Sequence, residues 1–376
     1  MNSLNFILLL VCFTPVSLQN GAEITNLQGD LLNLLEIKEK PSVARSRSQV
    51  PKYVMDLYKE QAHTTGFTKF GKSAPRKTIR TFFRDTSVSE DKSRLYFNLS
   101  SLKPNEQIEK AELRLFKRRS KLENTHGHFK VTVYRLNRRP VEGNTSWKKK
   151  LTTVATKHVK CRRVGGWVVL NVTSAVSFWS SWPSRNFGLW ISVKGIGIPT
   201  SDFFIATGGR KEPILVIYGD DKDKKQDKSL RPFSEIPNET RHNGEDKHNK
   251  GKGKNKQDTS GIMNRRRRSV GDVSCARHKL FVKFRDLNWD KWIIAPRGFS
   301  AYYCMGTCPE VIDKYYDPSN HAIIQNLLHH RLNKNIPAAC CVPTSLNSMS
   351  LMYFELDGSI VLKEYPGMVA STCGCR

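Results

Sequence analysis

Cysteines are the residues of this chain with the clearest capacity for chemistry. Thiols at high density can form disulfides, bind zinc or carry out redox exchange. Zinc would use Cys304, Cys308, Cys373 and Cys375, but the segment lacks the Cys-x-x-Cys pair that is typical of zinc and redox sites. The pattern therefore predicts a disulfide framework with no metal and no cofactor. Seven of the nine cysteines fall within the last 102 residues, namely Cys275, Cys304, Cys308, Cys340, Cys341, Cys373 and Cys375.

Six of these cysteines could pair in 15 ways, and their spacing alone does not choose among them. Glycines favour one arrangement, because Gly306 lies within CMGTC and Gly374 within CGC. Glycine leaves room at the centre of a ring and allows backbone angles that other residues avoid. Two disulfides could then close a ring that a third disulfide threads. The pairs of this knot would be Cys304 with Cys373, Cys308 with Cys375, and Cys275 with Cys341.

Cys340 is left over from this pairing, beside Cys341. Adjacent cysteines rarely bridge each other, because the preferred disulfide geometry is hard to reach across one peptide unit. An odd cysteine in an exported protein suggests a bond between chains. We therefore expect Cys340 to join two copies in a two-fold dimer. Cys161 has no partner in the first part of the chain, and the sequence leaves its role open.

The beginning of the chain predicts export. Residues 1–19 contain an apolar run followed by small residues, which is typical of a secretory signal peptide and too short to span a bilayer. We therefore expect a secreted, extracellular protein with no membrane insertion. The glycosylation sequons agree with this route. They lie at Asn98, Asn144, Asn171 and Asn238.

The charge is concentrated before the cysteine-rich segment. The chain has a formal charge of +28, yet residues 269–376 contain 11 Lys and Arg against 9 Asp and Glu. The excess is densest in 220–268, which has almost nothing to bury and is expected to be a disordered linker. Such a run could contact heparan sulfate or nucleic acid, but a solvated tether is the favoured interpretation. We expect no nucleic-acid partner.

The linker ends in NRRRRSVGD, an Arg-x-x-Arg pattern in a flexible segment. Proprotein convertases recognise this pattern, so cleavage is expected between Arg268 and Ser269, with Arg265 as the upstream arginine. A rival match at Arg135–Arg138 continues an alternating run and is expected to be a strand end.

The elements that must position the cysteines can be predicted from periodicity. HKLFVKFRD alternates apolar and charged residues like a half-buried strand, and SLMYFELDGSIVLKEY gives two strands around an Asp357–Gly358 turn. PSNHAIIQNLLHHRLN predicts a helix capped by Ser319 or Asn320. The resulting small, disulfide-rich β domain has two hairpin fingers, one helix and little interior, so disulfides must replace a core. Two tryptophans in such a domain, Trp289 and Trp292, are expected to stay partly exposed, but packing within the domain at a strand end is an alternative of about equal weight.

The first part of the chain predicts a different, α+β organisation. Residues of about 24–63 contain LLNLLEI and YVMDLY, which are typical of amphipathic helices with more apolar surface than they can bury alone. Alternating runs over about 76–219 predict a β-sandwich arm.

These motifs together resemble the transforming growth factor β superfamily, and specifically its bone morphogenetic protein branch. CMGTC, AACCVPTSLNSMSLMYF, CGCR, WDKWIIAP and SNHAIIQNLL carry the resemblance in 275–376, and VPKYVMDLYKEQ and NVTSAVSFWSSW carry a weaker one to the family's propeptide. The resemblance implies a cystine-knot cytokine. Its precursor would contain a signal peptide (1–19), a propeptide (20–219), a basic linker (220–268) and the mature growth factor (269–376).

The resemblance also implies partners. The mature dimer, with itself or a related chain, would assemble type I and type II receptor serine/threonine kinases and activate SMAD signalling. Its own propeptide would wrap it and cover the receptor sites, and extracellular antagonists and heparan sulfate are further expected partners. The type I site would use Trp289, Trp292, Ile312 and Asn320. The type II site would use Ala295, Ser350, Leu351, Met352 and Leu362.

One departure from the branch follows Cys308, where the usual aromatic and proline are replaced by Glu310 and Val311. A carboxylate in place of an aromatic side chain is costly to bury unpaired, so the choice of type I receptor is open.

Two other function classes are weighed against a signalling ligand. A secreted cystine-knot antagonist would sequester related ligands, but convertase release and intact receptor sites disfavour it. An enzyme is disfavoured because the histidines form no nucleophile or metal constellation. They are His278, His321, His329 and His330.

Overall fold

The computed structural model describes two compact units of the chain. The first, the arm-and-finger unit, contains the described residues up to 225 with 279–302 and 346–369; the second, the knot unit, contains 274–278, 303–345 and 370–376. The described residues are 32, 37, 47–63, 77–88, 91–102, 106–119, 127–141, 146–160, 164–197, 199–200, 205, 209–220 and 274–376.

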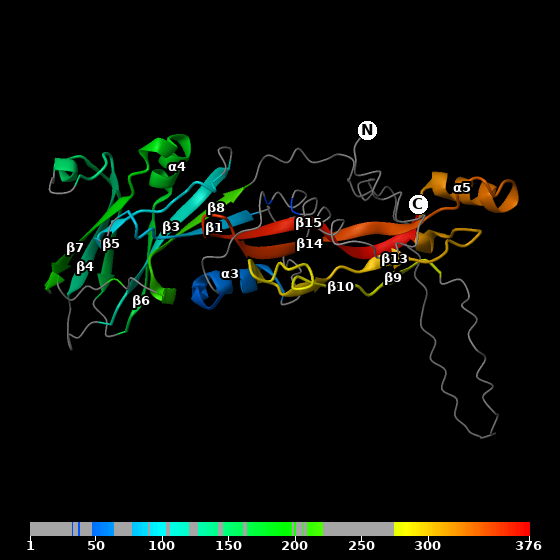
Figure 1. The fold of residues 1–376 in the computed structure, drawn as a ribbon, viewed down its shortest axis with the longest axis horizontal. Coiled ribbons are helices and arrows are strands. Elements are labelled where there is room, and N and C mark those ends of the chain that lie inside the picture. Colours follow the sequence, from blue (N-terminus) through cyan, green and yellow to red (C-terminus); the bar gives the residue numbers. More distant parts are fainter. Residues whose placement is uncertain are drawn as a thin grey trace, which may run out of the picture. The chain divides into compact units, whose positions relative to one another are not determined.

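The elements that precede the linker are mainly strands (Figure 1). The helices are α3 (Lys52–Gln61) and α4 (Thr173–Ser181). The strands are β1 (Lys77–Phe83), β2 (Arg94–Leu95), β3 (Gln107–Lys117), β4 (His128–Leu136), β5 (Leu151–Lys160), β6 (Gly166–Asn171), β7 (Leu189–Ile196) and β8 (Ile214–Asp220).

The elements that follow the linker include one helix, α5 (Asn320–Arg331), and a 3-10 turn, η7 (Lys314–Tyr316). The strands are β9 (Ala276–His278), β10 (Phe281–Lys283), β11 (Ile293–Ala295), β12 (Gly298–Ser300), β13 (Tyr303–Met305), β14 (Cys341–Phe354) and β15 (Ile360–Cys375).

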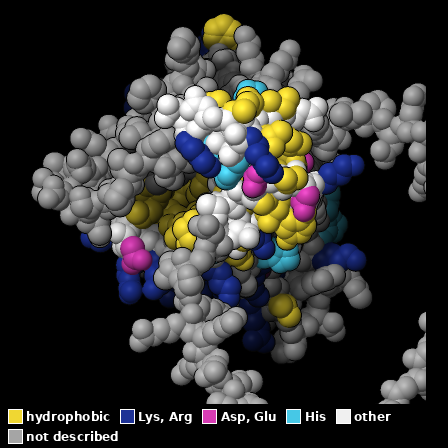
Figure 2. All heavy atoms as spheres, turned by 90° about the vertical axis from the view of Figure 1, so that its right-hand side faces the viewer, with side chains coloured by type: hydrophobic (Ala, Val, Ile, Leu, Met, Phe, Trp, Pro, Cys, Tyr) yellow, Lys and Arg dark blue, Asp and Glu magenta, His cyan; other side chains and the backbone are white. Residues whose placement is uncertain are grey.

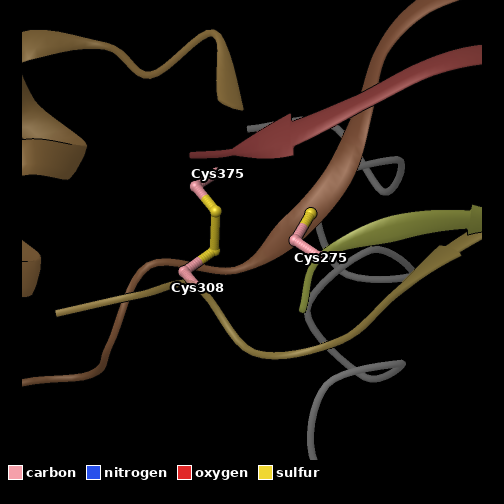
Figure 3. A group of neighbouring side chains, drawn as sticks. All are labelled: Cys275, Cys308 and Cys375. Atoms are coloured by element: carbon pink, nitrogen blue, oxygen red, sulfur yellow. A yellow bond between two sulfur atoms is a disulfide. The ribbon is translucent and has the colours of Figure 1, made fainter. Parts of the chain in front are cut away.

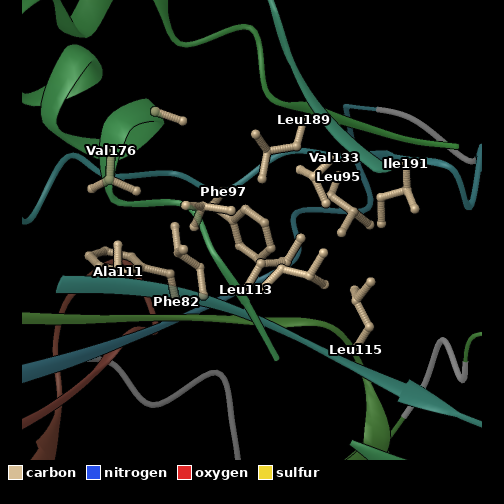
Figure 4. Packing of buried hydrophobic residues seen from close by; sticks show 14 of the residues in the cluster. Phe82, Leu95, Phe97, Ala111, Leu113, Leu115, Val133, Val176, Leu189 and Ile191 are labelled. Atoms are coloured by element: carbon tan, nitrogen blue, oxygen red, sulfur yellow. The ribbon is translucent and has the colours of Figure 1, made fainter. Parts of the chain in front are cut away.

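Two sheets of the arm-and-finger unit share one hydrophobic core. A four-stranded sheet has the order β2-β7-β4-β5, and a seven-stranded sheet has the order β11-β14-β15-β1-β8-β3-β6. Phe82 and Leu113 from the larger sheet pack with Val133 and Leu189 from the smaller one, and Val176 of α4 joins them (Figure 4). All of these side chains are buried because each strand presents alternate residues to the core.

The larger sheet joins strands from both sides of the linker. β14 and β15 form a hairpin around Asp357 and Gly358, where Gly358 takes a φ of +76° that suits glycine. β1 then pairs antiparallel with β15, placing Ile79 opposite Leu362. On its other side β1 pairs with β8 along its whole length. The finger hairpin and the arm are therefore parts of one continuous sheet.

Helix α3 lies against this sheet through its apolar side. Its sequence KYVMDLYKEQ places Val54, Leu57 and Tyr58 at helical spacing, and all three are buried. They share a cluster with Met352 and Leu362 of the finger hairpin. The excess apolar surface predicted for this helix is thus covered by the finger.

The prediction of a mainly β fold with disulfides in the last hundred residues is confirmed. The single strand predicted from HKLFVKFRD is interrupted. Strand β9 ends at His278 and β10 begins at Phe281, and Leu280 between them is 44% exposed where the alternation predicted a buried residue. The predicted signal peptide, the linker beyond Asp220, and the helical region apart from residues 32, 37 and 47–63 lie outside the described residues. Among the helices that the structure describes, none is long and apolar enough to cross a membrane.

Candidate functional site

Three disulfides hold the knot unit together. They are Cys275–Cys341, Cys304–Cys373 and Cys308–Cys375, the pairs expected from the glycine positions. Each links residues 66 to 69 positions apart in the sequence, so the strands β9, β13, β14 and β15 are tied where their ends meet. Crosslinks over such long loops restrict the unfolded chain strongly.

The sulfurs of this knot lie close together. Those of Cys275, Cys308 and Cys375 are all within 4.8 Å of one another, and the three residues are buried (Figure 3). They pack with Ile312 and Ala322 in a small cluster that supplies what apolar core this unit has. Since each sulfur is bonded to another sulfur, the group is a disulfide cluster and offers no thiolate to a metal.

Glycine is needed for different reasons at the two glycine positions of the knot. Gly306 takes a φ of +127°, as expected for a position closed to other residues. At Gly374 the structure shows a reason that the sequence did not predict. A Cβ there would overlap the carbonyl oxygen of Tyr316 and would lie 2.7 Å from Thr344. Gly374 is therefore required by the close approach of the η7 turn.

Cys340 is half-buried and belongs to none of the three disulfides. Its backbone exchanges two hydrogen bonds with the backbone of Arg376, at 2.8 and 2.9 Å. The last residue of the chain is thus fixed beside the cysteine that we expect to join two copies.

Helix α5 buries one side and exposes apolar residues on the other. Ser319 caps it, with its hydroxyl accepting from the Ala322 amide at 3.1 Å. On the buried side, the Asn326 amide donates to the carbonyl oxygens of Pro309 and Glu310. On the other side Ile324 is 60% exposed. Hydrophobic side chains are gathered on the face that Figure 2 shows. The exposed apolar residues of α5 and its C-cap are Ile323, Ile324, Leu327 and Leu332.

The tryptophans predicted for the type I site are buried, so the expectation that they stay partly exposed is wrong. Trp289 is 1% and Trp292 0% exposed, with ring centroids 5.3 Å apart. They share a cluster with Phe299 and with Ile37, which lies far upstream in the sequence. Apart from Ile37, the buried members of this cluster all lie within 284–369, so the tryptophans are packed mainly by their own domain, which is the alternative weighed for them.

The other two predicted type I residues lie in the knot unit. Ile312 is buried in the disulfide cluster, and Asn320 is exposed at the first position of α5. The structure therefore brings Trp289 and Trp292 together, and it places Ile312 and Asn320 on a separate unit.

All five residues predicted for the type II site are buried in this structure. Ala295, Met352 and Leu362 lie in the cluster with α3 and β1. Leu351 points to the opposite side of β14 and packs with the tryptophans, as alternation along a strand requires. Ser350 is also buried. Three of these positions, Ala295, Met352 and Leu362, are thus packed with residues that precede the predicted cleavage point.

A buried arginine of β1 forms ion pairs both within the arm and with the finger hairpin. Arg80 of β1 is 2% exposed, and its Nε donates to Glu106 at 2.9 Å while its Nη1 donates to Glu355 at 2.9 Å. Burial alone would lower the pKa of Arg80, but the two carboxylates prevail and raise it. Sequence reasoning missed this residue, although an arginine inside the β-rich run KTIRTFF was a signal.

A second polar group fastens α3 to the arm. The hydroxyls of Tyr53 and Tyr218 are 2.6 Å apart, and the Arg114 guanidinium lies 3.3 Å from the centre of the Tyr53 ring. Burial and the Tyr53 contact raise the pKa of Tyr218. Burial alone would raise the pKa of Glu112, but hydrogen bonds from Lys110 and Arg114 lower it below its usual range.

Glu310, the departure from the branch pattern, is exposed and paired. Its Oε1 lies 2.5 Å from the Nε of Arg331 at the end of α5. Since both side chains are open to solvent, the expected cost of burying an unpaired carboxylate does not arise in this chain.

Several predicted site residues lie outside the described part of the chain. These are Arg265, Arg268 and Ser269 of the cleavage site, the sequons Asn144 and Asn238, and Cys161. Asn98 and Asn171 are described, and both are exposed.

Three clustered disulfides, a long β14–β15 hairpin and a single helix define a cystine-knot protein. Residues 274–375 match the family model of the transforming growth factor beta like domain, and residues 16–202 match that of the TGF-beta propeptide. The chain therefore belongs to the transforming growth factor β superfamily. Members of this family are growth factors and not enzymes, form dimers and have a propeptide.

Relatives place the chain among proteins of the bone morphogenetic branch. It is 31% identical to the protein DVR-1 homolog of Strongylocentrotus purpuratus over 78% of this chain and 63% of that protein. It is 31% identical to protein decapentaplegic of Drosophila melanogaster over 94% of this chain and 62% of that protein. It is 29% identical to bone morphogenetic protein 4 of Rattus norvegicus over 95% of this chain and 88% of that protein. The chain thus spans less than two thirds of the first two relatives.

Proposed function

We propose that this chain is the precursor of a secreted growth factor of the bone morphogenetic type. Cleavage after Arg268 releases residues 269–376, which act as a dimer joined through Cys340, with a second copy or with a related chain. The dimer assembles type I and type II receptor serine/threonine kinases and activates SMAD signalling. The family membership of both parts of the chain supports this proposal.

The main support for the proposal is that α3 and β1 cover apolar residues of the β14–β15 finger hairpin. α3 and β1 pack on Ala295, Met352 and Leu362, which are the positions assigned to type II binding by resemblance. The tryptophans assigned to type I binding are covered in the same precursor. The propeptide would keep these apolar receptor-binding side chains buried, and they would become accessible when it dissociates from the processed growth factor.

The exposed apolar side of α5 supports the dimer. A helix that leaves Ile324 and Leu327 in solvent has an unfilled contact surface in the single chain. A second copy joined at Cys340 would supply a matching apolar surface, because a two-fold contact uses the same patch on both chains.

The first experiment compares conditioned medium from cells expressing the wild-type chain, an Arg265→Ala/Arg268→Ala variant and a Cys340→Ser variant. Paired reducing and non-reducing gels should show a processed dimer only for the wild type, an unprocessed chain for the double variant and a processed monomer for Cys340→Ser. In a SMAD reporter assay only the wild type should raise the signal strongly. A processed dimer that only lowers the signal of another ligand would instead identify an antagonist.

The second experiment tests the two surfaces on the mature dimer. Trp289→Ala should weaken binding to type I receptor and spare type II, whereas Met352→Ala should do the reverse, each by about tenfold or more. Leu280→Ala, at an exposed position outside both clusters, is the matched control. Loss of both receptors in either variant, with a normal dimer on non-reducing gels, would contradict the assignment of separate sites.

A further inference from the structure

The four-stranded sheet of the arm carries an uncompensated positive charge. Strands β2, β4, β5 and β7 contain six Lys and Arg and two His, and none of their residues is Asp or Glu. The sheet lies in 94–196, well before the basic linker that already gives the chain much of its charge. The charge on this folded surface therefore needs an explanation of its own.

The strand register brings the charges together on one side of the sheet. Lys130 of β4 pairs directly with His158 of β5 and with Lys194 of β7, so the three lie in one row across three strands. Two residues along β4, His128 pairs with Lys160. With neighbouring strands about 4.8 Å apart, the row spans about 10 Å. These five residues are called the basic face: His128, Lys130, His158, Lys160 and Lys194.

The basic face points away from the core. Phe129, Val131 and Val133 alternate with His128 and Lys130 along β4, and all three are fully buried between the sheets. Lys130, His158, Lys160 and Lys194 are exposed. Like charges placed directly opposite each other across a strand pair destabilise a sheet. A sheet that keeps Lys130 opposite Lys194 has a local repulsion that a bound polyanion would relieve.

Further donors continue along the same side of the sheet. Thr156 is exposed next in register to His158, and its hydroxyl donates to the hydroxyl of the buried Thr132 at 3.4 Å. Lys148 lies over the ring of Trp190, with its Nζ 4.9 Å from the ring centre. Exposed cations therefore extend along this side of the sheet beside the Thr156 hydroxyl, which suits a linear chain bearing anionic groups.

We propose that the basic face binds a sulfated glycosaminoglycan chain, through ion pairs from its exposed lysines. A nucleic acid fits less well, because the His128 and His158 rings contact each other and the neighbouring Trp190 is half-buried beneath Lys148. An anionic membrane also fits less well, because this side of the sheet presents Ile196 as its exposed apolar residue and has no amphipathic helix. The site goes beyond the proposed signalling function and does not depend on it.

The test measures binding of a heparin oligosaccharide of defined length to the intact chain, with Arg265→Ala/Arg268→Ala present in every sample to prevent cleavage. The test variant carries Lys130→Thr, Lys160→Thr and Lys194→Thr, because threonine favours strands. The control carries Lys252→Thr, Lys254→Thr and Lys256→Thr in the linker, which changes the net charge equally. A third variant with arginine at the three basic-face positions retains the charge.

We expect the basic-face threonine variant to bind at least about tenfold more weakly and to lose about 2 from the slope of log Kd against log salt. The linker variant should change by less than about threefold, and the arginine variant should bind like the parent chain. Circular dichroism and secretion yield check that the sheet still folds. Equal or greater weakening in the linker variant, or unchanged binding in the basic-face variant, overturns the proposal. The proposal is also overturned if the basic-face threonine variant loses binding to phosphatidylserine vesicles but keeps its binding to heparin.

Discussion

The guanidinium of Arg80 donates to the carboxylate of Glu355 across 2.9 Å, and these two residues lie on opposite sides of the predicted cleavage point. Arg80 comes from strand β1 of the arm, and Glu355 closes the turn of the β14–β15 finger hairpin. The same arginine is held by Glu106, which is also buried. Cleavage of the chain breaks none of these contacts, so the propeptide should stay bound after processing.

Replacing Glu355 by glutamine should loosen the processed complex. The change keeps the size of the side chain but removes the charge that Arg80 meets, and a hydrogen bond to a charged group contributes about 1.5 kcal/mol or more. Surface plasmon resonance of purified propeptide on the mature dimer should therefore show a Kd about tenfold higher. Glu310→Gln removes an exposed carboxylate of the knot unit and should leave the Kd unchanged. Equal affinities for Glu355→Gln and wild type would show that the ion pair adds nothing to retention.

Shortening one apolar residue of α3 should open the finger surface. Leu57 is buried against the finger cluster, and a Leu→Ala change at such a site costs about 2 kcal/mol or more. The propeptide carrying Leu57→Ala should bind the mature dimer about thirtyfold more weakly. The processed complex should then give more SMAD reporter signal at equal concentration. Glu60→Ala, on the exposed side of the same helix, is the control. A signal that stays at the wild-type level despite weaker binding would argue against covering as the cause of inactivity.

A methyl group at Gly374 should prevent the knot unit from folding. The Cβ of alanine would overlap the Tyr316 carbonyl oxygen, and both groups are backbone-bound, so neither can turn away. Overpacking of this kind costs about 3 kcal/mol or more. Gly374→Ala should be retained in cells, and non-reducing gels should show scrambled disulfides. Gly166→Ala, where a Cβ meets nothing within 4 Å, should be secreted normally. Secretion of Gly374→Ala as a normal dimer would refute this account.

Stability of the arm should depend on pH through Glu112. Its pKa in the folded chain lies below the ordinary value of 4.5, so its contribution is fully present above pH 4.5 and disappears as the pH falls through the lowered pKa. Glu112→Gln should thus lower the Tm of the uncleaved precursor at pH 7, and this difference from wild type should shrink towards pH 3. The exposed Glu60→Gln variant controls for net charge. A difference in Tm that is constant across this range would contradict a lowered pKa for Glu112.

Local features of the fold could be predicted because they depend on neighbouring residues. The Ser319 cap, the turn at Asp357–Gly358 and the helix that begins at Asn320 each follow from a few adjacent side chains. The three disulfide pairs followed from glycine positions and agree with the family pattern.

Contacts between distant segments could not be predicted in this way. The alternation in a strand shows that one side is buried, but it does not show what covers that side. Trp289 and Trp292 were expected to stay partly exposed because the domain was thought to lack a core, whereas side chains from 284–369 bury them in a cluster that Ile37 joins from about 250 positions upstream. The pairing of Ile79 with Leu362 likewise joins two strands whose separate patterns contain no information about each other.

The antiparallel pairing of β1 with β15 has a consequence for the moment of release. While the two strands are joined, each has a partner on both sides. Strand β15 lies between β14 and β1, and strand β1 lies between β15 and β8. Separation leaves two unprotected edge strands, one on each departing piece, with amide and carbonyl groups that can recruit any other strand. Free propeptide and free growth factor should therefore both be prone to aggregation, and a dilute extracellular medium or a prompt new partner would keep them soluble.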